Sequence, residues 1–112
     1  MAHDAPAGPK GPTKLVIRNI GLLISGDLEK PILDADTIVA ENGRITAIGR
    51  LKDVDTEGAT TTVDAGGAAV TPGLIDSHVH PVAGDWTPRQ SQMNWIDSSL
   101  HGGVTTMISA GE

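Results

Sequence analysis

An Asn-Gly pair between two apolar runs constrains the fold of this chain more than any other feature. The runs Thr37-Ile38-Val39-Ala40 and Arg44-Ile45-Thr46-Ala47-Ile48-Gly49 flank Glu41-Asn42-Gly43. Asn and Gly both tolerate positive φ, which the tightest hairpin turns require. The pattern therefore predicts a β-hairpin over residues 37–49.

Short apolar runs separated by turn residues continue this pattern along the first 71 residues. Residues 15–20 and 22–24 predict two short strands, and residues 61–64 and 68–71 predict two more. Between them, residues 50–60 form a loop. Its alternating acidic residues suggest either a cation site or, as we expect, a solvated loop; they are Asp53, Asp55 and Glu57.

Length and composition limit the class of protein. A chain of 112 residues with no Phe or Tyr supports one small domain with a thin core. The net charge of −6, without a Lys/Arg cluster, argues against nucleic acid or an anionic membrane as a partner. The absence of Cys excludes disulfides and thiolate metal sites. With neither a long apolar stretch nor a signal-peptide pattern, we expect a cytoplasmic protein.

The first 13 residues differ from the rest of the chain. They contain Pro6, Pro9 and Pro12 and almost no apolar side chains. Such a segment buries too little surface to offset the entropy of ordering it. We predict a disordered tail over residues 1–13, in which His3 has no functional role.

A strand–helix–strand pattern occupies the last 40 residues. Residues 73–80 predict a buried strand, and residues 104–109 predict a second strand. Between them, Thr87-Pro88-Arg89-Gln90 has the form of a capped helix start, and Gly102-Gly103 supplies the stop. This βαβ order predicts two parallel strands with a right-handed crossover, the start of an α/β domain that needs further strands.

The helix itself carries two further signals. Met93, Ile96 and Leu100 recur at helical spacing and predict one buried face. His101 lies in the last turn, where positive charge suits the helix dipole. We favour this role for His101 over a catalytic one.

The pair His78 and His80 is the candidate metal-binding feature of the chain. Residues i and i+2 of a strand point to the same face, so the two imidazoles project together. They stand at the C-terminal end of a strand that opens a βαβ unit, where parallel barrels build their active sites. Asp76 has the same parity, and either positions a ligand histidine or makes structural hydrogen bonds at a barrel floor.

Two segments resemble a known family. Residues 70–80, Val-Thr-Pro-Gly-Leu-Ile-Asp-Ser-His-Val-His, look like the first-strand signature of the amidohydrolase superfamily, and residues 102–106, Gly-Gly-Val-Thr-Thr, look like its second-strand entry. Residues 35–49 resemble the small β-sandwich that precedes the barrel in imidazolonepropionases, dihydroorotases and hydantoinases. Residues 85–90 and 100–111 are most similar to the enamidase branch, whose members hydrolyse a cyclic enamide.

The resemblance covers residues 14–111 and implies a fold. Residues 14–71 would form an N-terminal β-sandwich segment, and residues 72–112 the first βαβ of a TIM-type (β/α)8 barrel, truncated after its second strand. The likeness also implies a cytoplasmic enzyme that is a homo-oligomer in its full-length form and acts on a small cyclic amide.

The resemblance further implies a metal site. His78 and His80 would bind a divalent metal, Zn²⁺ or in some members Fe²⁺, in a site that is binuclear in the full-length parent. The family completes it with a carboxylated Lys or a Glu, two more histidines and a proton-shuttling Asp, none of which the motifs place within residues 1–112. No catalytic residue is therefore expected in this fragment, and Arg89 is either a surface residue or a contact for a substrate carboxylate.

Two other classes of protein remain open from the sequence. One is a non-catalytic β-rich assembly module or pseudoenzyme, and the other is one part of a split amidohydrolase whose remaining strands come from another chain. The chain by itself is expected to be inactive and poorly soluble, because a single βαβ unit leaves an open edge and an uncovered apolar face.

Overall fold

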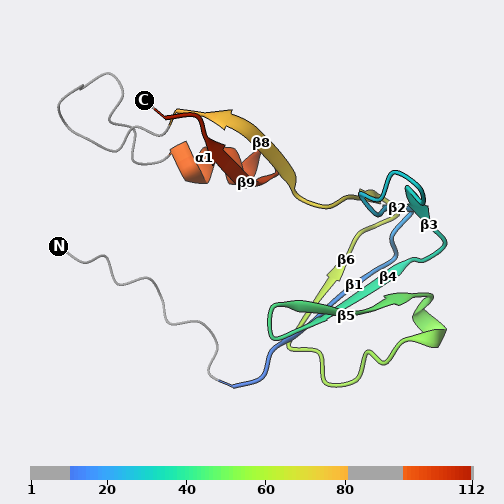
Figure 1. Ribbon diagram of the computed structural model, residues 1–112. Coiled ribbons are helices and arrows are strands. Elements are labelled where there is room, and N and C mark those ends of the chain that lie inside the picture. Colours follow the sequence, from blue (N-terminus) through green and yellow to red (C-terminus); the bar gives the residue numbers. More distant parts are fainter. Residues whose placement is uncertain (1–10, 81–94, 112) are drawn as a thin grey trace. The chain divides into compact units, whose positions relative to one another are not determined.

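The computed structural model of the chain describes residues 11–80 and 95–111 (Figure 1). These residues fall into two compact units that divide between Thr71 and Pro72. The elements of the first unit are β1 (Lys14–Arg18), β2 (Leu22–Ile24), β3 (Ile32–Leu33), β4 (Thr37–Glu41), β5 (Arg44–Gly49), the 3-10 turn η1 (Leu51–Asp53), β6 (Thr61–Asp64) and β7 (Ala69–Val70). Those of the second are β8 (Leu74–Val79), α1 (Trp95–His101) and β9 (Val104–Ser109).

The predicted hairpin is confirmed as β4 and β5. Glu41 pairs with Arg44 across a two-residue turn, in which φ is 53° at Asn42 and 81° at Gly43. Two consecutive positive φ values are typical of a type I′ turn, whose twist matches that of the strands it joins. A bulge interrupts the pairing between Val39 and Ala40.

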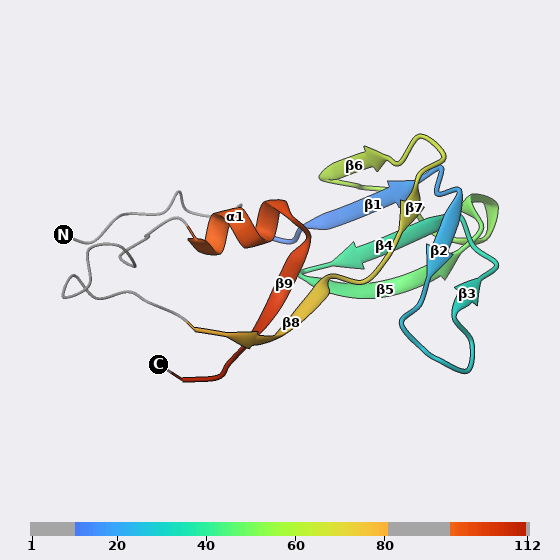
Figure 2. The same cartoon turned by 90° about the horizontal axis from the view of Figure 1, so that it is seen from above.

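Two sheets make up the first unit, and the chain passes between them three times. The larger sheet has the order β5-β4-β1-β6 and the smaller one the order β3-β2-β7. β1 continues into β2, β3 into β4 and β6 into β7. The connected strands therefore have the same order in both sheets, β4-β1-β6 in the larger and β3-β2-β7 in the smaller (Figure 2). β1 is antiparallel to β4 and parallel to β6, and β2 is antiparallel to β3 and parallel to β7.

The core of this unit lies where these runs change sheets. Ile20, Leu23, Ala35 and Ile38 form its buried cluster, and Ile17, Leu33, Ala65 and Val70 pack against it. Backbone hydrogen bonds join the runs at the same place, from Ile20 N–H to Asp36 O (3.1 Å), from Gly21 N–H to Ala68 O (2.9 Å) and from Gly67 N–H to Asn19 O (2.8 Å). Apolar burial and backbone pairing therefore coincide at this corner.

The second unit contains one pair of strands and one helix within the described residues. β8 and β9 are parallel, as the sequence predicted, and α1 lies against β9. The helix ends at His101, and Gly103 follows it with φ of 94°, the left-handed conformation that terminates many helices. His101 is thus in the last turn, as expected.

Two predictions about burial are wrong. The strand expected to be buried, β8, exposes most of its residues, with Leu74 57% and Ile75 64% exposed. The helix face expected to be buried is also open, since Ile96 and Leu100 are each 55% exposed. The physical reason is the same for both: a parallel strand needs cover on two faces, and the described part of this unit has a single helix.

Smaller differences concern short elements. β3 was not predicted, because a two-residue run gives no periodic signal. The loop over residues 50–60 contains the short turn η1, and the strand predicted over residues 68–71 is limited to Ala69–Val70.

Several predictions fall outside the described residues. They concern the tail over residues 1–10, including His3, the helix start at Thr87-Pro88, Arg89 and Met93. Within residues 11–80 and 95–111, no helix is long and apolar enough to cross a membrane.

Candidate functional site

The two candidate ligand histidines face each other at the C-terminal end of β8. His78 lies in the strand and His80 directly follows its last residue, Val79. Their Nε2 atoms are 3.2 Å apart, and their rings are 5.0 Å apart between centroids at an angle of 77°. The alternation of the strand thus brings both imidazoles to one place, as the sequence predicted.

The backbone of the neighbouring strand end holds the ring of His80. Nδ1 of His80 lies 2.6 Å from the carbonyl oxygen of Gly111, which follows β9. Because a carbonyl oxygen only accepts hydrogen bonds, Nδ1 carries a proton, and in the neutral imidazole Nε2 then presents its lone pair. The backbone N–H of Ala110 donates a hydrogen bond to Val79 O (2.8 Å), which holds the end of β9 beside the end of β8.

Gly111 is a site residue that sequence reasoning missed. Its contribution is a backbone carbonyl, which no motif of side chains reports. The available signal was topological, since the ends of adjacent parallel strands meet at one edge.

The separation of the two Nε2 atoms fits two ligands of one metal ion. Zinc–imidazole bonds of roughly 2.0–2.1 Å in a tetrahedral arrangement place two ligand nitrogens about 3.3 Å apart. The observed 3.2 Å is close to this value. The chemistry of the donors fits as well, because a neutral imidazole with a fixed tautomer is a common ligand for divalent metals.

Asp76 acts on the backbone next to this pair. Its Oδ1 accepts a hydrogen bond from the backbone N–H of His78 at 3.1 Å. This contact is a structural hydrogen bond of the kind considered for Asp76 from the sequence. It fixes the chain at His78 rather than the ring.

The remaining sequence candidates do not join the histidine pair in the described part of the chain. There, no three His, Cys, Asp or Glu side chains form a group suited to a metal ion. Arg89 lies outside the described residues. In the acidic loop, Asp55 pairs with Lys14 at 3.8 Å and its carboxylate accepts the Glu57 N–H, which are structural contacts.

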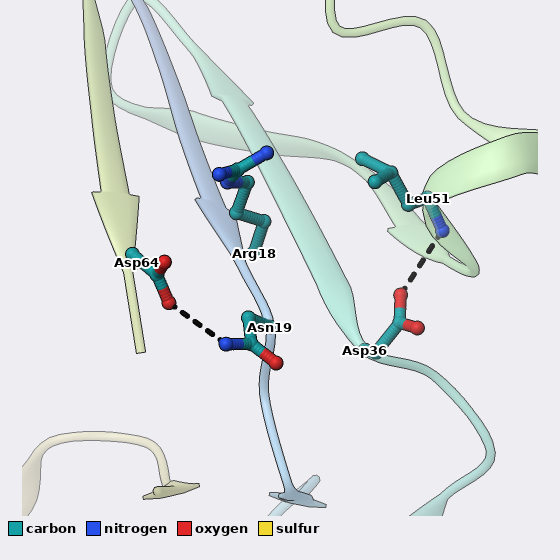
Figure 3. Close-up of a pocket in the computed structure, with 5 residues that line it drawn as sticks. All are labelled: Arg18, Asn19, Asp36, Leu51 and Asp64. Atoms are coloured by element: carbon teal, nitrogen blue, oxygen red, sulfur yellow. Dashed lines mark hydrogen bonds between the residues drawn. The ribbon is translucent and has the colours of Figure 1, made fainter. Parts of the chain in front are cut away.

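A polar pocket of about 290 Å³ lies in the first unit (Figure 3). Asp64 accepts a hydrogen bond from Nδ2 of Asn19 at 3.0 Å, and Asp36 accepts one from the backbone N–H of Leu51 at 3.0 Å. The lining residues are Arg18, Asn19, Asp36, Leu51 and Asp64. No sequence motif indicated this pocket, because its residues come from separate strand ends.

The two carboxylates of the pocket are held ionised by their hydrogen bonds. The hydroxyl of Thr37, followed by the Leu51 N–H and Arg50, lowers the pKa of Asp36. The amide of Asn19 and the Gly66 N–H lower the pKa of Asp64. The bonds from Asn19 and from the Leu51 N–H join different segments of the unit, whereas those from Thr37 and the Gly66 N–H are local. We therefore assign both carboxylates a structural role.

Arg50 completes this network beside the pocket. It pairs with Asp34 and, at 3.5 Å, with Asp36, and the pairing with Asp34 raises the pKa of its guanidinium. The cation is therefore already engaged by carboxylates of its own chain. Among the described residues, the histidine pair is therefore the candidate for a role beyond structure.

Comparison with known proteins gives the chain its relatives. It is 56% identical over 99 residues to enamidase from Eubacterium barkeri. The aligned region covers 88% of this chain and 26% of the relative. It is 38% identical over 96 residues to imidazolonepropionase from Paenarthrobacter aurescens (strain TC1), covering 85% and 23%. No family model matches the chain.

Solved structures agree with these relatives. A crystal structure of enamidase, described as a member of the amidohydrolase superfamily, matches with a TM-score of 0.76 and 53% identity over 89% of this chain and 26% of that one. L-hydantoinase from Arthrobacter aurescens matches with a TM-score of 0.61 and 31% identity, covering 85% and 20%.

The chain thus spans about a quarter of the length of the relatives it matches. The matched structure of enamidase extends over both units, because it covers 89% of the chain. The homologues of this chain are enamidase and other members of the amidohydrolase superfamily, and the chain corresponds to their N-terminal part.

Proposed function

We propose that the chain is the N-terminal portion of a metal-dependent amidohydrolase that hydrolyses a C–N bond of a cyclic amide, as an enamidase-like enzyme. The observation that carries this proposal is the approach of the two Nε2 atoms to 3.2 Å at the end of β8. It occurs in a chain 56% identical to enamidase over 99 residues.

In this proposal each residue of the site has a separate task. His78 and His80 bind a divalent metal, Zn²⁺ or alternatively Fe²⁺, which is one of two in the full-length protein. When bound, the metal lowers the pKa of a water molecule and polarises the substrate carbonyl. The Gly111 carbonyl orients the ring of His80, and Asp76 fixes the backbone that carries His78.

The remaining parts of the proposal concern the whole protein. Residues 14–71 form part of a β-sandwich, and β8, α1 and β9 open a (β/α)8 barrel. Arg89 is either a surface residue or a contact for a carboxylate of the substrate, and the catalytic groups and further ligands come from outside residues 1–112. The full-length protein is a cytoplasmic homo-oligomer that binds neither nucleic acid nor membranes.

Metal analysis of the protein expressed from its full coding sequence tests the role of the histidines. We expect one to two divalent ions per chain. His78→Ala and His80→Ala should each lower the affinity for the metal by more than the roughly 10–100-fold that is typical of residues that only support ligands. His101→Ala is the matched control and should retain the metal. A folded, metal-free wild-type protein would contradict the proposal.

Activity measurements on the same protein test the reaction. A panel of a cyclic enamide, a hydantoin, dihydroorotate and an imidazolone should give metal-dependent ring opening with at least one member. A folded protein that binds metal and opens none of them would favour a pseudoenzyme, and co-purification of a second chain that restores activity would favour a split enzyme. The 112-residue chain alone should be inactive, because a catalytic zinc site needs about three protein ligands.

A further inference from the structure

Two asparagines of the described chain have positive φ, Asn19 with 58° and Asn42 with 53°. Positive φ is uncommon outside glycine, although asparagine adopts it more readily than most residues. The two sites differ in the next residue, which is Ile20 after Asn19 and Gly43 after Asn42. Both Asn42 and Gly43 are exposed.

The hairpin turn is one peptide rotation away from a second standard turn. In the observed type I′ turn, ψ of the first central residue is about +30°, whereas in type II′ it is about −120° and φ of the first residue stays near +60°. The change is a flip of the peptide between Asn42 and Gly43. Gly43 accepts either geometry because, without a Cβ, glycine adopts positive and negative φ about equally readily.

The contacts that hold Asn42 do not involve this peptide. Its backbone N–H donates to Thr13 O at 2.9 Å, and its side-chain Oδ1 accepts the Thr13 N–H at 2.9 Å. The pairing of Glu41 with Arg44 also lies on the outer side of the turn. A flip of this peptide would therefore leave the pairing of the sheet intact.

A ψ near −120° brings the backbone nitrogen of Gly43 to the same side as the Asn42 side chain. In that arrangement the nitrogen faces Cγ at the distance of a five-membered ring. The hydrogen bond from Thr13 withdraws electron density from the same amide and makes Cγ more electrophilic.

We propose that Asn42 is a site of spontaneous deamidation that the folded protein reaches through this peptide flip. The Gly43 nitrogen loses its proton and forms a bond to Cγ, the Cγ–Nδ2 bond breaks, and ammonia leaves. Water then adds to either carbonyl of the resulting succinimide and yields aspartate or isoaspartate. Isoaspartate lengthens the backbone by one carbon within the two-residue turn and so breaks its geometry and the contact with Thr13.

Asn19 provides the contrast within the same fold. The N–H of the following residue, Ile20, donates to Asp36 O at 3.1 Å, and Ile20 is buried in the core cluster. The side chain of Asn19 is itself held by Asp64 at 3.0 Å. The nucleophile and the amide are both fixed, so this asparagine should remain intact in the folded chain.

The test is a time course of the folded protein at neutral and mildly alkaline pH. Peptide mapping by mass spectrometry, with enzymatic methylation of isoaspartate, follows Asn42 and Asn19 separately, and a synthetic peptide of residues 38–47 gives the unfolded reference. The Asn42→Asp variant marks the aspartate product; it reaches the same succinimide only by losing water, so it should form isoaspartate more slowly than the wild-type protein.

We expect conversion at Asn42 to be faster than at Asn19 and to increase with pH. Conversion in the folded protein should be less than about a hundredfold slower than in the peptide, because a local flip costs less free energy than unfolding. If the reaction required global unfolding, it would be slower by about a thousandfold or more. A larger suppression than a hundredfold, or equal rates at Asn42 and Asn19, would overturn the proposal. Neither result depends on the proposed hydrolase activity.

Discussion

At Gly21 and Gly73, in the described part of the chain, a hydrogen atom is the only side chain that fits. A Cβ on Gly21 would lie 2.0 Å from the backbone oxygen of Gly67, and a Cβ on Gly73 would lie 1.9 Å from Oγ1 of Thr105. Both glycines therefore allow neighbouring segments to approach closely. In the sequence, Gly21 is only the turn residue that separates the predicted strands over residues 15–20 and 22–24.

Gly21→Ala should lower the free energy of unfolding of the first unit by about 1–3 kcal/mol, because the backbone of Gly67 cannot move without disturbing the corner. Urea unfolding followed by circular dichroism measures this change. Gly49→Ala is the control, since its Cβ would lie 3.2 Å from a side-chain atom, Cγ1 of Val54, which has to move by only a few tenths of an ångström. We expect it to stay within about 1 kcal/mol of wild type; equal losses in both variants would refute the explanation.

The carboxylates of the polar pocket give the first unit an acid-sensitive contribution. The pKa values of Asp36 and Asp64 are lower in the folded chain than their ordinary values. Such groups stabilise the fold above the unfolded pKa, and this stabilisation is lost as pH falls through the folded pKa.

The urea midpoint of wild type should therefore fall as the pH is lowered below the ordinary aspartate pKa of about 4. In the double variant Asp36→Asn/Asp64→Asn this fall should be smaller, while stability at neutral pH is reduced. Urea titrations at a series of acidic pH values compare the two proteins. Identical acid dependence would exclude a role for these two carboxylates.

Among the elements, the hairpin and the parallel strand pair differ in how far the local sequence specifies their structure. Asn42-Gly43 specifies the turn between β4 and β5, because both residues accept the positive φ that it needs. The pairing of β8 with β9 follows from the strand–helix–strand order. The burial of β8 and β9 does not, since it depends on elements beyond the pair.

Exposed isoleucines on the strand pair should drive self-association of the 112-residue chain. Ile75 pairs opposite Thr106, two residues before Ile108, so both isoleucines share one face, where they are 64% and 53% exposed. Ile75→Thr/Ile108→Thr should reduce association, as measured by sedimentation velocity. Val63→Thr, which changes an exposed residue of the first unit, should have a smaller effect; an equal effect would argue against this face.

At the scale of the whole molecule, the two units differ in how much core they contain. Every buried apolar residue of the described chain belongs to the first unit: Val16, Ile20, Leu23, Ala35, Ile38 and Val39. The second unit combines exposed apolar strands with one helix. Its stability must therefore depend on further contacts.

Division of the chain between Thr71 and Pro72 should separate these behaviours. We expect residues 11–71 to unfold cooperatively in urea with low stability, as is usual for a domain of about 60 residues. Residues 72–112 should show no cooperative transition. Circular dichroism during urea titration of both pieces tests this, and a cooperative transition of the second piece alone would contradict it.

The sequence by itself determined the features that depend on neighbouring residues. These are the hairpin at Asn42-Gly43, the parallel order of β8 and β9, and the placement of His78 and His80 on one side of a strand. Each follows from backbone preferences or from a period of two or of 3.6 residues.

Only the tertiary structure decided which distant segments meet. It brought the Gly111 carbonyl to the ring of His80, gathered Asn19, Asp36 and Asp64 around one pocket, and placed the core where three runs change sheets. It also left β8 exposed, although Leu74, Ile75 and Val79 are apolar. The reason is physical: burial and hydrogen bonding across a fold depend on what packs against a residue, and local sequence does not contain that information.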